Sequence, residues 1–314
     1  MTDTTNKAPT EAVLAPDVVT PEVVPAQAPK QGKPASLWSD AWKELRRKPS
    51  FIISALLVIL MMIMAAFPQL FTSVDPRDCS LIDALQTPTA EHRFGTDLQG
   101  CDYYARTIWG ARTSVSIGLV VTFFATLIAV ALGSLAGYKG GWIDSTLSRF
   151  TDIMFAIPLI LAALVILNAL GGSRGIWTVS AVLIVFGWTT MMRLMRSSVL
   201  SVKELDYIDA ARALGASDWR IITRHVLPNG ITPVIVYATI TVGVVITVEA
   251  SLSFLNVGLQ LPAISWGLMI NAAQNRILAF PHLLFFPGLF LSVTVFAFIL
   301  MGDALRDALD PKLR

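Results

Sequence analysis

The chain has 314 residues, of which 54% are hydrophobic and only 15% are charged. A typical soluble domain carries about 25% charged residues, so this composition argues against a soluble protein and favours one that crosses a membrane several times. The formal net charge is only +2, which gives no reason to expect nucleic-acid binding. The nucleotide-hydrolase phosphate loop is also missing, because the only Gly-Lys pair, Gly32-Lys33, is followed by Pro34 and lacks the preceding glycine.

The N-terminal region divides into two parts. Residues 1–36 contain six prolines and no aromatic residue, which predicts a disordered tail that is not a secretory signal. Residues 37–50 place Trp38, Trp42 and Leu45 at helical spacing beside several lysines and arginines. This pattern predicts an amphipathic helix on the membrane surface. A juxtamembrane segment that only flanks the first span is an equal alternative.

Uncharged or nearly uncharged stretches suited to crossing a bilayer fill most of residues 51–302, which we assign to a transmembrane domain. A bilayer core needs about 20 helical residues, and the predicted spans are 51–71, 113–137, 147–170, 176–192, 230–256 and 283–302. Pro158 interrupts the third span. Residues 250–275 are uncharged too, but Asn256, Gln260 and Pro262 predict a loop or short helix folded back on the spans. The expected fold is therefore an all-α membrane protein with six transmembrane helices.

The basic residues orient these spans. With the N-terminus inside, all but six of the 24 lysines and arginines fall on the inner side; the six are Arg77, Arg93, Arg106, Arg112, Arg174 and Arg276. The positive-inside rule then predicts that both termini are cytoplasmic. It also places residues 193–229 and the C-terminal tail 303–314 in the cytoplasm, and residues 72–111 and 257–282 outside.

Residues 193–229 form a polar segment between two spans. A helix is expected over 202–214, because apolar residues recur every three positions at Leu205, Ile208, Ala211 and Leu214. Gly215 can end it in the left-handed conformation, and Ser217 can cap a second helix. That helix would end at Pro228, and its apolar face would be formed by Trp219, Ile222 and Val226. Small residues beside the turn let another surface approach closely.

Specific motifs in this segment carry a resemblance. Asp209-Ala-Ala-x-x-x-Gly215, followed by His225-x-Leu-Pro228, is similar to the EAA loop of bacterial ABC-importer permeases. Residues 37–314 resemble the C-type permease subunit of dipeptide and oligopeptide importers through the motifs Phe94-Gly-Thr-Asp97, Gly110-Ala-Arg112, Gly141-Trp-Ile-Asp144, Glu249-Ala-Ser-Leu-Ser-Phe254, Ser265-Trp-Gly267 and Gly302-Asp-Ala-Leu-Arg-Asp-Ala-Leu-Asp-Pro311. Asp209 stands where glutamate is usual, and Cys101 and Asn256 stand where arginine and glycine are commoner.

The resemblance implies a type I importer permease whose cytoplasmic coupling helix docks on an ATPase. The docking residues would be Asp209, Ala210, Ala211, Arg212, Gly215, Ala216 and Trp219. Such a chain is not an enzyme and binds no cofactor itself, since ATP and magnesium belong to two ATPase subunits or one fused ATPase. A second permease, an extracytoplasmic binding protein and the bacterial cell-membrane bilayer complete the expected partners. Dipeptides or oligopeptides are the expected substrates, with glutathione or a nickel chelate as alternatives.

A few remaining polar residues have competing interpretations. Glu249 and Asn256 could line a transport pathway or gate. For Glu249 we favour a structural role instead, in which the carboxylate forms a hydrogen bond between helices at a partly wet helix end. Asp152 is expected to accept a hydrogen bond near a helix start. Cys79 and Cys101 both map outside, where a disulfide is favoured over two free thiols. The three histidines lie in different segments and have no metal-ligand spacing, so no metal site is expected.

Two other functional classes are weaker. An intramembrane enzyme needs catalytic groups that face one another, whereas Glu249 and Asp152 are predicted at opposite depths. An ATP-independent secondary transporter or channel would have no need for a polar docking segment.

Overall fold

The computed structural model describes residues 2, 42–171 and 174–309. The chain divides into two units, Met1–Ser36 and Leu37–Arg314. Apart from Thr2, the predicted tail lies outside the described residues, as do residues 37–41 and 310–314. Within the described part of the second unit, the regular secondary structure is helical, with isolated β-bridges in one loop region. The all-α prediction is therefore confirmed.

The main helices follow one another along the chain as α2 (Pro49–Ala66), α3 (Tyr103–Lys139), α4 (Gly141–Ala156), α5 (Leu159–Leu170), α6 (Ile176–Gly187), α7 (Thr189–Lys203), α8 (Asp206–Ala213), α9 (Asp218–Ile221), α10 (Leu227–Gly230), α11 (Thr232–Phe254), α12 (Trp266–Ala273) and α13 (His282–Leu309). Short 3-10 turns lie at Pro68–Leu70, Leu81–Asp83 and Gln274–Arg276, and a π-helical turn at Ile222–Val226.

Among the described residues, five helical segments are long and apolar enough to cross a membrane: α2, α3, α6 with α7, α11 and α13. The pair α4 and α5 is long and apolar enough only when taken together, and it bends by 82° at its break, the geometry of a broken span or a re-entrant loop. Pro158 lies at that break, where its ring and missing N–H interrupt a helix. The predicted third span is therefore two helices pointing in different directions, and it begins at Gly141 instead of residue 147.

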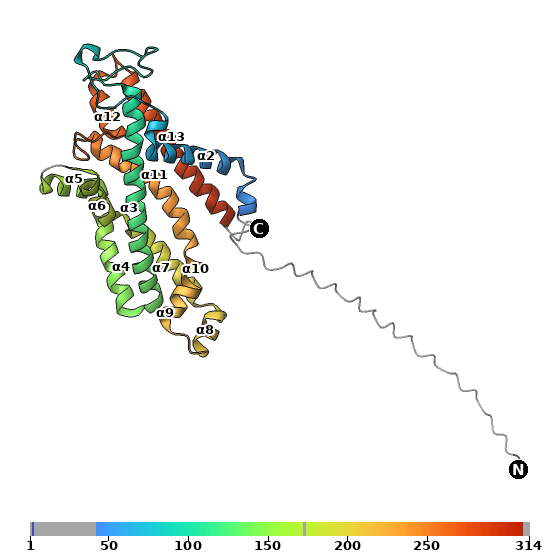
Figure 1. The fold of residues 1–314 in the computed structure, drawn as a ribbon. Helices are drawn as coiled ribbons and strands as arrows, with labels where there is room; N and C mark the ends of the chain where they lie inside the picture. Colours follow the sequence, from blue (N-terminus) through green and yellow to red (C-terminus); the bar gives the residue numbers. More distant parts are fainter. Residues whose placement is uncertain (1, 3–41, 172–173, 310–314) are drawn as a thin grey trace. The chain divides into compact units, whose positions relative to one another are not determined.

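Helix α3 is the centre of the bundle and packs against α2, α6, α7 and α11 (Figure 1). Its 37 residues reach about 55 Å at about 1.5 Å per residue, well beyond the bilayer core of about 30 Å. The helix begins earlier than the predicted residue 113, because the Asp102 carboxylate caps it by accepting from the Ala105 N–H at 2.7 Å.

Glycines let α3 and α7 approach closely. A Cβ added to Gly133 would lie 2.7 Å from both the Met192 carbonyl oxygen and the Met195 Cβ. One added to Gly137 would lie 2.9 Å from the Arg196 carbonyl oxygen. Small residues at such positions allow backbones to pack tightly where lipid provides little hydrophobic drive for association.

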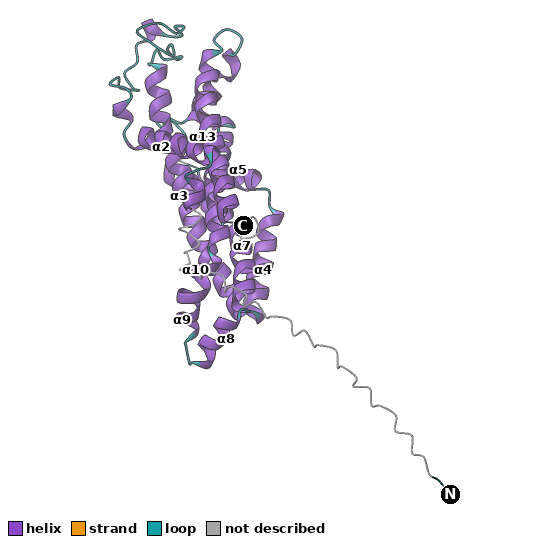
Figure 2. Ribbon diagram, turned by 90° about the vertical axis from the view of Figure 1, so that its right-hand side faces the viewer, coloured by secondary structure: helices purple, strands orange, loops and turns teal. Residues whose placement is uncertain are grey.

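The bundle has two distinct ends. Residues 67–102, here called the cap, lie at one end together with α12, and α8 and α9 lie at the other (Figure 1). The rotated view in Figure 2 shows the same division, with non-helical segments at both ends of the packed helices. Helix α12 lies in the segment predicted to fold back, and it packs against α11 and α13.

Several predicted boundaries are wrong. The helix predicted over 37–50 is described only at 42–45, and α2 starts at Pro49, a residue suited to the first helical turn. Span one ends at Ala66, not residue 71, because Pro68 starts a 3-10 turn. At the other end of the chain, α13 continues through the predicted tail to Leu309, since Ala304 and Ala308 bury against Leu45.

Candidate functional site

The polar loop, residues 204–230, projects from the end of the bundle opposite the cap (Figure 1). It is shorter than the predicted segment 193–229, because α7 continues to Lys203. The Lys203 Nζ donates to the Gly137 carbonyl oxygen at 2.9 Å and ties the end of α7 to the end of α3. The helix predicted over 202–214 therefore starts only at Asp206, after a break at Glu204 and Leu205.

A defined turn joins the two arms of the polar loop. Gly215 has φ +80°, the left-handed conformation that was predicted for it. Its N–H donates to the Arg212 carbonyl, and the Ala216 N–H donates to the Ala211 carbonyl at 3.1 Å. This pair of bonds is the Schellman arrangement, which satisfies carbonyls left free at a helix end. Backbone hydrogen bonds therefore define the turn.

The second arm leads into the transmembrane helix α11, with a bend at Ile231 between α10 and α11. Ser217 caps α9 as predicted, accepting from the Arg220 N–H at 3.4 Å. A π-helical turn follows at Ile222–Val226, then α10 and α11. Pro228 does not end the helix, contrary to the prediction, because it lies in the first turn of α10, where a missing N–H costs nothing.

Three apolar side chains anchor the loop in the bundle. Ile208, Ile221 and Val226 are fully buried in one cluster with Met195 and Val199 of α7. Of the other residues on the apolar faces predicted from spacing, Ala211 and Ile222 are half-buried and the rest are exposed. Leu214 is 89% exposed and Trp219 is 75% exposed. A helix as short as α8 can turn only one or two residues toward the bundle, so most of its apolar residues remain on the surface.

Polar contacts brace the loop against the end of α3. Asp218 accepts from the Tyr138 hydroxyl at 3.0 Å and pairs with the Lys139 Nζ at 2.5 Å. The Lys139 hydrogen bond, with that of Tyr138, lowers the pKa of the exposed Asp218 carboxyl. Arg212 pairs with Asp209 at 2.8 Å, and its guanidinium lies 5.8 Å from the Tyr138 ring centre. Sequence reasoning missed Tyr138 and Lys139, because they lie 80 and 79 positions before Asp218 in the chain.

The predicted docking residues gather on the projecting surface of the loop. Asp209, Ala210, Arg212, Gly215 and Trp219 are exposed, and Ala211 and Ala216 are half-buried. The exposed Leu214 lies in the same turn and was not predicted as a docking residue, although its position beside Gly215 was a usable signal. The projecting surface therefore consists of small and apolar residues, and the base of the loop is anchored in the bundle by buried side chains.

Two ion pairs join α4 to α7 at the same end of the bundle. Asp144 accepts from the Nε and Nη2 of Arg196 at 2.5 and 2.6 Å. Asp152 accepts from the Arg193 Nη2 at 2.7 Å. Asp152 lies near the end of α4 and not near a helix start as predicted, because the helix begins at Gly141.

Glu249 is fully buried, so the prediction of a partly wet carboxylate is wrong. It accepts from the Ser253 hydroxyl at 2.8 Å and lies 3.3 Å from the Ser114 hydroxyl of α3. The Ser114 oxygen also accepts from the backbone N–H of Trp266, the first residue of α12, at 3.3 Å. The carboxylate thus belongs to a hydrogen-bond network that joins α3, α11 and the start of α12. Asn256 lies outside this network, just after α11.

The cap is closed by a disulfide between Cys79 and Cys101. Next to it, Asp97 forms an ion pair with Arg106 of α3 and accepts from the Cys101 N–H at 3.0 Å. The disulfide and the ion pair therefore hold the same short stretch of the cap on the end of α3.

The fold and the projecting loop agree with comparisons to known proteins. Residues 129–314 match the family described as binding-protein-dependent transport system inner membrane component. The chain belongs to this family. Residues 36–88 also match the N-terminal transmembrane domain of oligopeptide transport permease C. The first match includes the polar loop, α11 and the buried Glu249, so the described loop is part of the family's shared domain.

Members of this family at 36–37% identity cover almost the whole chain. The oligopeptide transport system permease protein OppC of Bacillus subtilis is 36% identical over 90% of this chain and 92% of its own. The dipeptide transport system permease protein DppC of Alkalihalophilus pseudofirmus is 37% identical over 96% of this chain and 98% of its own. The glutathione transport system permease protein GsiD of Pectobacterium atrosepticum is 36% identical over 88% of this chain and 92% of its own.

Solved structures support the fold. An inward-facing structure of the MetNI methionine ABC transporter contains a chain that matches with a TM-score of 0.54 at 21% identity. The match covers 64% of this chain and 95% of that one. The helical arrangement of the type I importer permeases is therefore shared, and the chain is a multi-pass membrane transport component.

Proposed function

We propose that this chain is one of two permease subunits of an ATP-driven importer of dipeptides or oligopeptides. The observation that carries the proposal is the polar loop: a rigidly anchored helical hairpin that presents Ala210, Leu214 and Trp219 to the exterior of the bundle. Exposed apolar groups on a fixed, small-residue surface are typical of a site where another protein docks. The names of the relatives supply the substrate class.

The partner on this loop is an ATPase subunit in the cytoplasm. The positive-inside distribution of lysine and arginine supports that orientation for the loop end. A second ATPase subunit, or a fused one, serves the second permease, and ATP and magnesium bind there. An extracytoplasmic binding protein delivers substrate at the cap end.

Coupling follows from the way the loop is attached. When the ATPase subunits close on ATP, they displace the loop together with its anchors, Ile208 and Ile221. Movement passes to α7 through these anchors and to α11 through the successive helical turns that follow Ser217. The ion pairs of Arg193 and Arg196 with α4 transmit the movement of α7 to that helix. Access then alternates between the two sides of the membrane.

Copurification tests the docking role. The chain is coexpressed with its ATPase subunits, and Ala210→Trp is compared with Ala90→Trp, an exposed alanine in the cap. We expect Ala210→Trp to lose the ATPase subunits and ATP-driven uptake, while Ala90→Trp keeps the ATPase subunits bound. If Ala210→Trp retains both, the loop is not the docking site.

A glutathione importer is the second candidate, because a relative with that name is as similar as the peptide permeases. Uptake of labelled trialanine and labelled glutathione by the reconstituted complex separates them. Trialanine uptake that excess glutathione does not inhibit supports the peptide importer, and the opposite pattern supports the alternative.

A further inference from the structure

A cavity of about 440 Å³ lies between the cap and the segment after α11. Asp97 and Arg106 line it from the cap and α3, Asn256 and Gln260 from the loop after α11, and Met269 and Asn271 from α12. Binding sites for small ligands occupy about 300 to 1,000 Å³, so the space suits a molecule of a few residues. The residues of the polar loop do not contribute to it.

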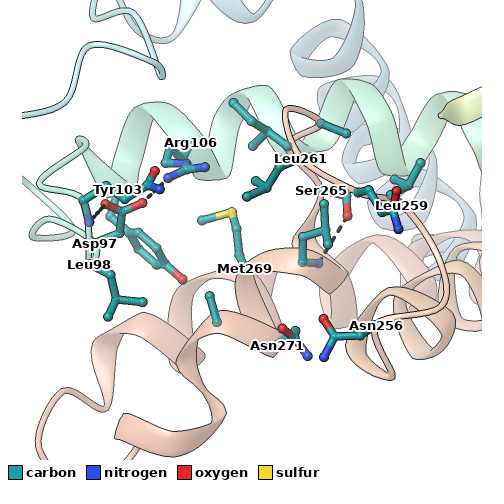
Figure 3. Close-up of a pocket in the computed structure, with 16 residues that line it drawn as sticks. Asp97, Leu98, Tyr103, Arg106, Asn256, Leu259, Leu261, Ser265, Met269 and Asn271 are labelled. Atoms are coloured by element: carbon teal, nitrogen blue, oxygen red, sulfur yellow. Dashed lines mark hydrogen bonds and ion pairs between the residues drawn. The ribbon is translucent and has the colours of Figure 1, made fainter. Parts of the chain in front are cut away.

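Polar groups are concentrated at the two ends of this cavity. Figure 3 shows Asn256 and Asn271 next to each other at one end, Asp97 and Arg106 at the other, and the Met269 side chain between them. Asp97 and Arg106 neutralise one another, and the Arg106 Nε has no hydrogen-bond partner within the described residues. The lining is therefore polar without a net charge, and apolar in the middle.

The amides present free hydrogen-bonding groups. Asn271 uses its Nδ2 to donate to the Phe254 carbonyl at 2.6 Å, which leaves its oxygen as an acceptor. The Gln260 oxygen accepts from the Arg174 N–H at 3.4 Å, which leaves its amide nitrogen as a donor. A primary amide both donates and accepts, as does each peptide unit of a substrate.

The backbone conformation of Asn256 shows whether the fold requires its side-chain amide. Its φ is +62°, in the left-handed region that glycine adopts most readily and that asparagine tolerates. Within the described part of the chain, its side-chain amide forms no hydrogen bond. Glycine would therefore satisfy the backbone equally well, and the amide is an addition that the fold does not require.

We propose that this cavity is a subsite for the backbone of a short, uncharged or zwitterionic peptide at the entrance to the membrane domain. The proposal rests on the proposed peptide-import function and adds a location and a recognition chemistry to it. The amides of Asn256, Gln260 and Asn271 bind peptide N–H and carbonyl groups, and the Met269 side chain contacts a small apolar side chain.

Photocrosslinking in the complete reconstituted importer tests the subsite. A photoreactive amino acid replaces Leu261, which lines the cavity, and a control replaces Leu278, which is 98% exposed and does not line it. The probe is radiolabelled trialanine, delivered by the binding protein in the presence of ATP. We expect the peptide to be labelled from position 261 and not from position 278.

Asn256→Gly in the crosslinking background tests the amide, because it keeps the left-handed backbone. We expect the yield from position 261 to fall about threefold to tenfold at subsaturating peptide, corresponding to the loss of one hydrogen bond. Thermal stability and ATPase copurification should not change. An unchanged yield overturns the role of Asn256.

The remaining outcomes separate the two proposals. If the complex imports trialanine but position 261 labels no peptide, or labels only the binding protein or the second permease, the cavity is not a peptide subsite and the importer proposal stands. If the complex fails to import trialanine at all, the proposed peptide-import function itself is wrong.

Discussion

Asp144 and Arg196 form a two-point ion pair, with Nε–Oδ1 and Nη2–Oδ2 distances of 2.5 and 2.6 Å, that fastens α4 to α7 directly above the polar loop. Two parallel bonds fix the direction of the guanidinium as well as its distance. Since α7 carries Met195 and Val199, against which the loop is anchored, the pair connects α4 to any movement of the loop.

Replacing Asp144 with asparagine should therefore destabilise the complex and weaken coupling. The Asp144 side chain is 19% exposed and Arg196 is 33% exposed, and hydrogen bonds to charged groups of this kind contribute about 1 to 3 kcal/mol. We expect a lower thermal unfolding midpoint in detergent and less peptide uptake per ATP hydrolysed. Asp152→Asn is the matched control, because its single, half-exposed contact with Arg193 should contribute below about 1 kcal/mol. Equal effects of the two variants would contradict a special role for the two-point pair.

The contact between α3 and α7 depends on Gly133. Alanine there would place a Cβ 2.7 Å from the Met192 carbonyl oxygen, a backbone atom that cannot rotate away. We expect Gly133→Ala to cost about 1 to 3 kcal/mol of folding free energy through overpacking, measured by thermal unfolding of the purified chain. Gly288→Ala is the control, since nothing lies within 4 Å of its Cβ. If both variants unfold at the same temperature, the helices can separate at no cost.

The disulfide between Cys79 and Cys101 closes a loop with a sequence separation of 22 residues. In the chain-entropy model a loop of this size stabilises the folded state by about 3 kcal/mol. We expect a reducing agent to lower the unfolding temperature of the wild type but not that of the Cys79→Ser, Cys101→Ser double variant. Alkylation and mass measurement without reductant provide an independent check, and two labelled thiols would contradict the bridge.

Asp218 should make the polar loop sensitive to acid. Lys139 and Tyr138 lower the folded-state pKa of this carboxyl, so its contribution to stability is complete above the unfolded value of about 3.9. It is lost as the pH falls through the lowered folded value. Amide hydrogen exchange in α8 and α9 should therefore show constant protection above about pH 5 and a loss below about pH 4. Asp218→Asn should remove this step and leave protection within α11 unchanged.

Predictions from short-range patterns were accurate where one residue and its neighbours determine the local backbone conformation. The left-handed Gly215, the cap at Ser217 and the break at Pro158 depend on local backbone chemistry, and the structure has all three. Boundaries were less accurate when a long-range contact set them. The Asp102 cap and the burial of Ala304 and Ala308 lengthened α3 and α13 beyond their apolar stretches.

The sequence by itself determined that this chain is an all-helical membrane protein with a polar segment between two spans, because hydropathy and turn chemistry are local properties. Only the tertiary structure decided which polar groups meet. It paired Asp144 with Arg196 and Asp218 with Lys139, buried Glu249 against Ser114, and brought Asn256 beside Asn271 at one end of a cavity. Those contacts depend on how distant helices pack, and no spacing along the chain encodes them.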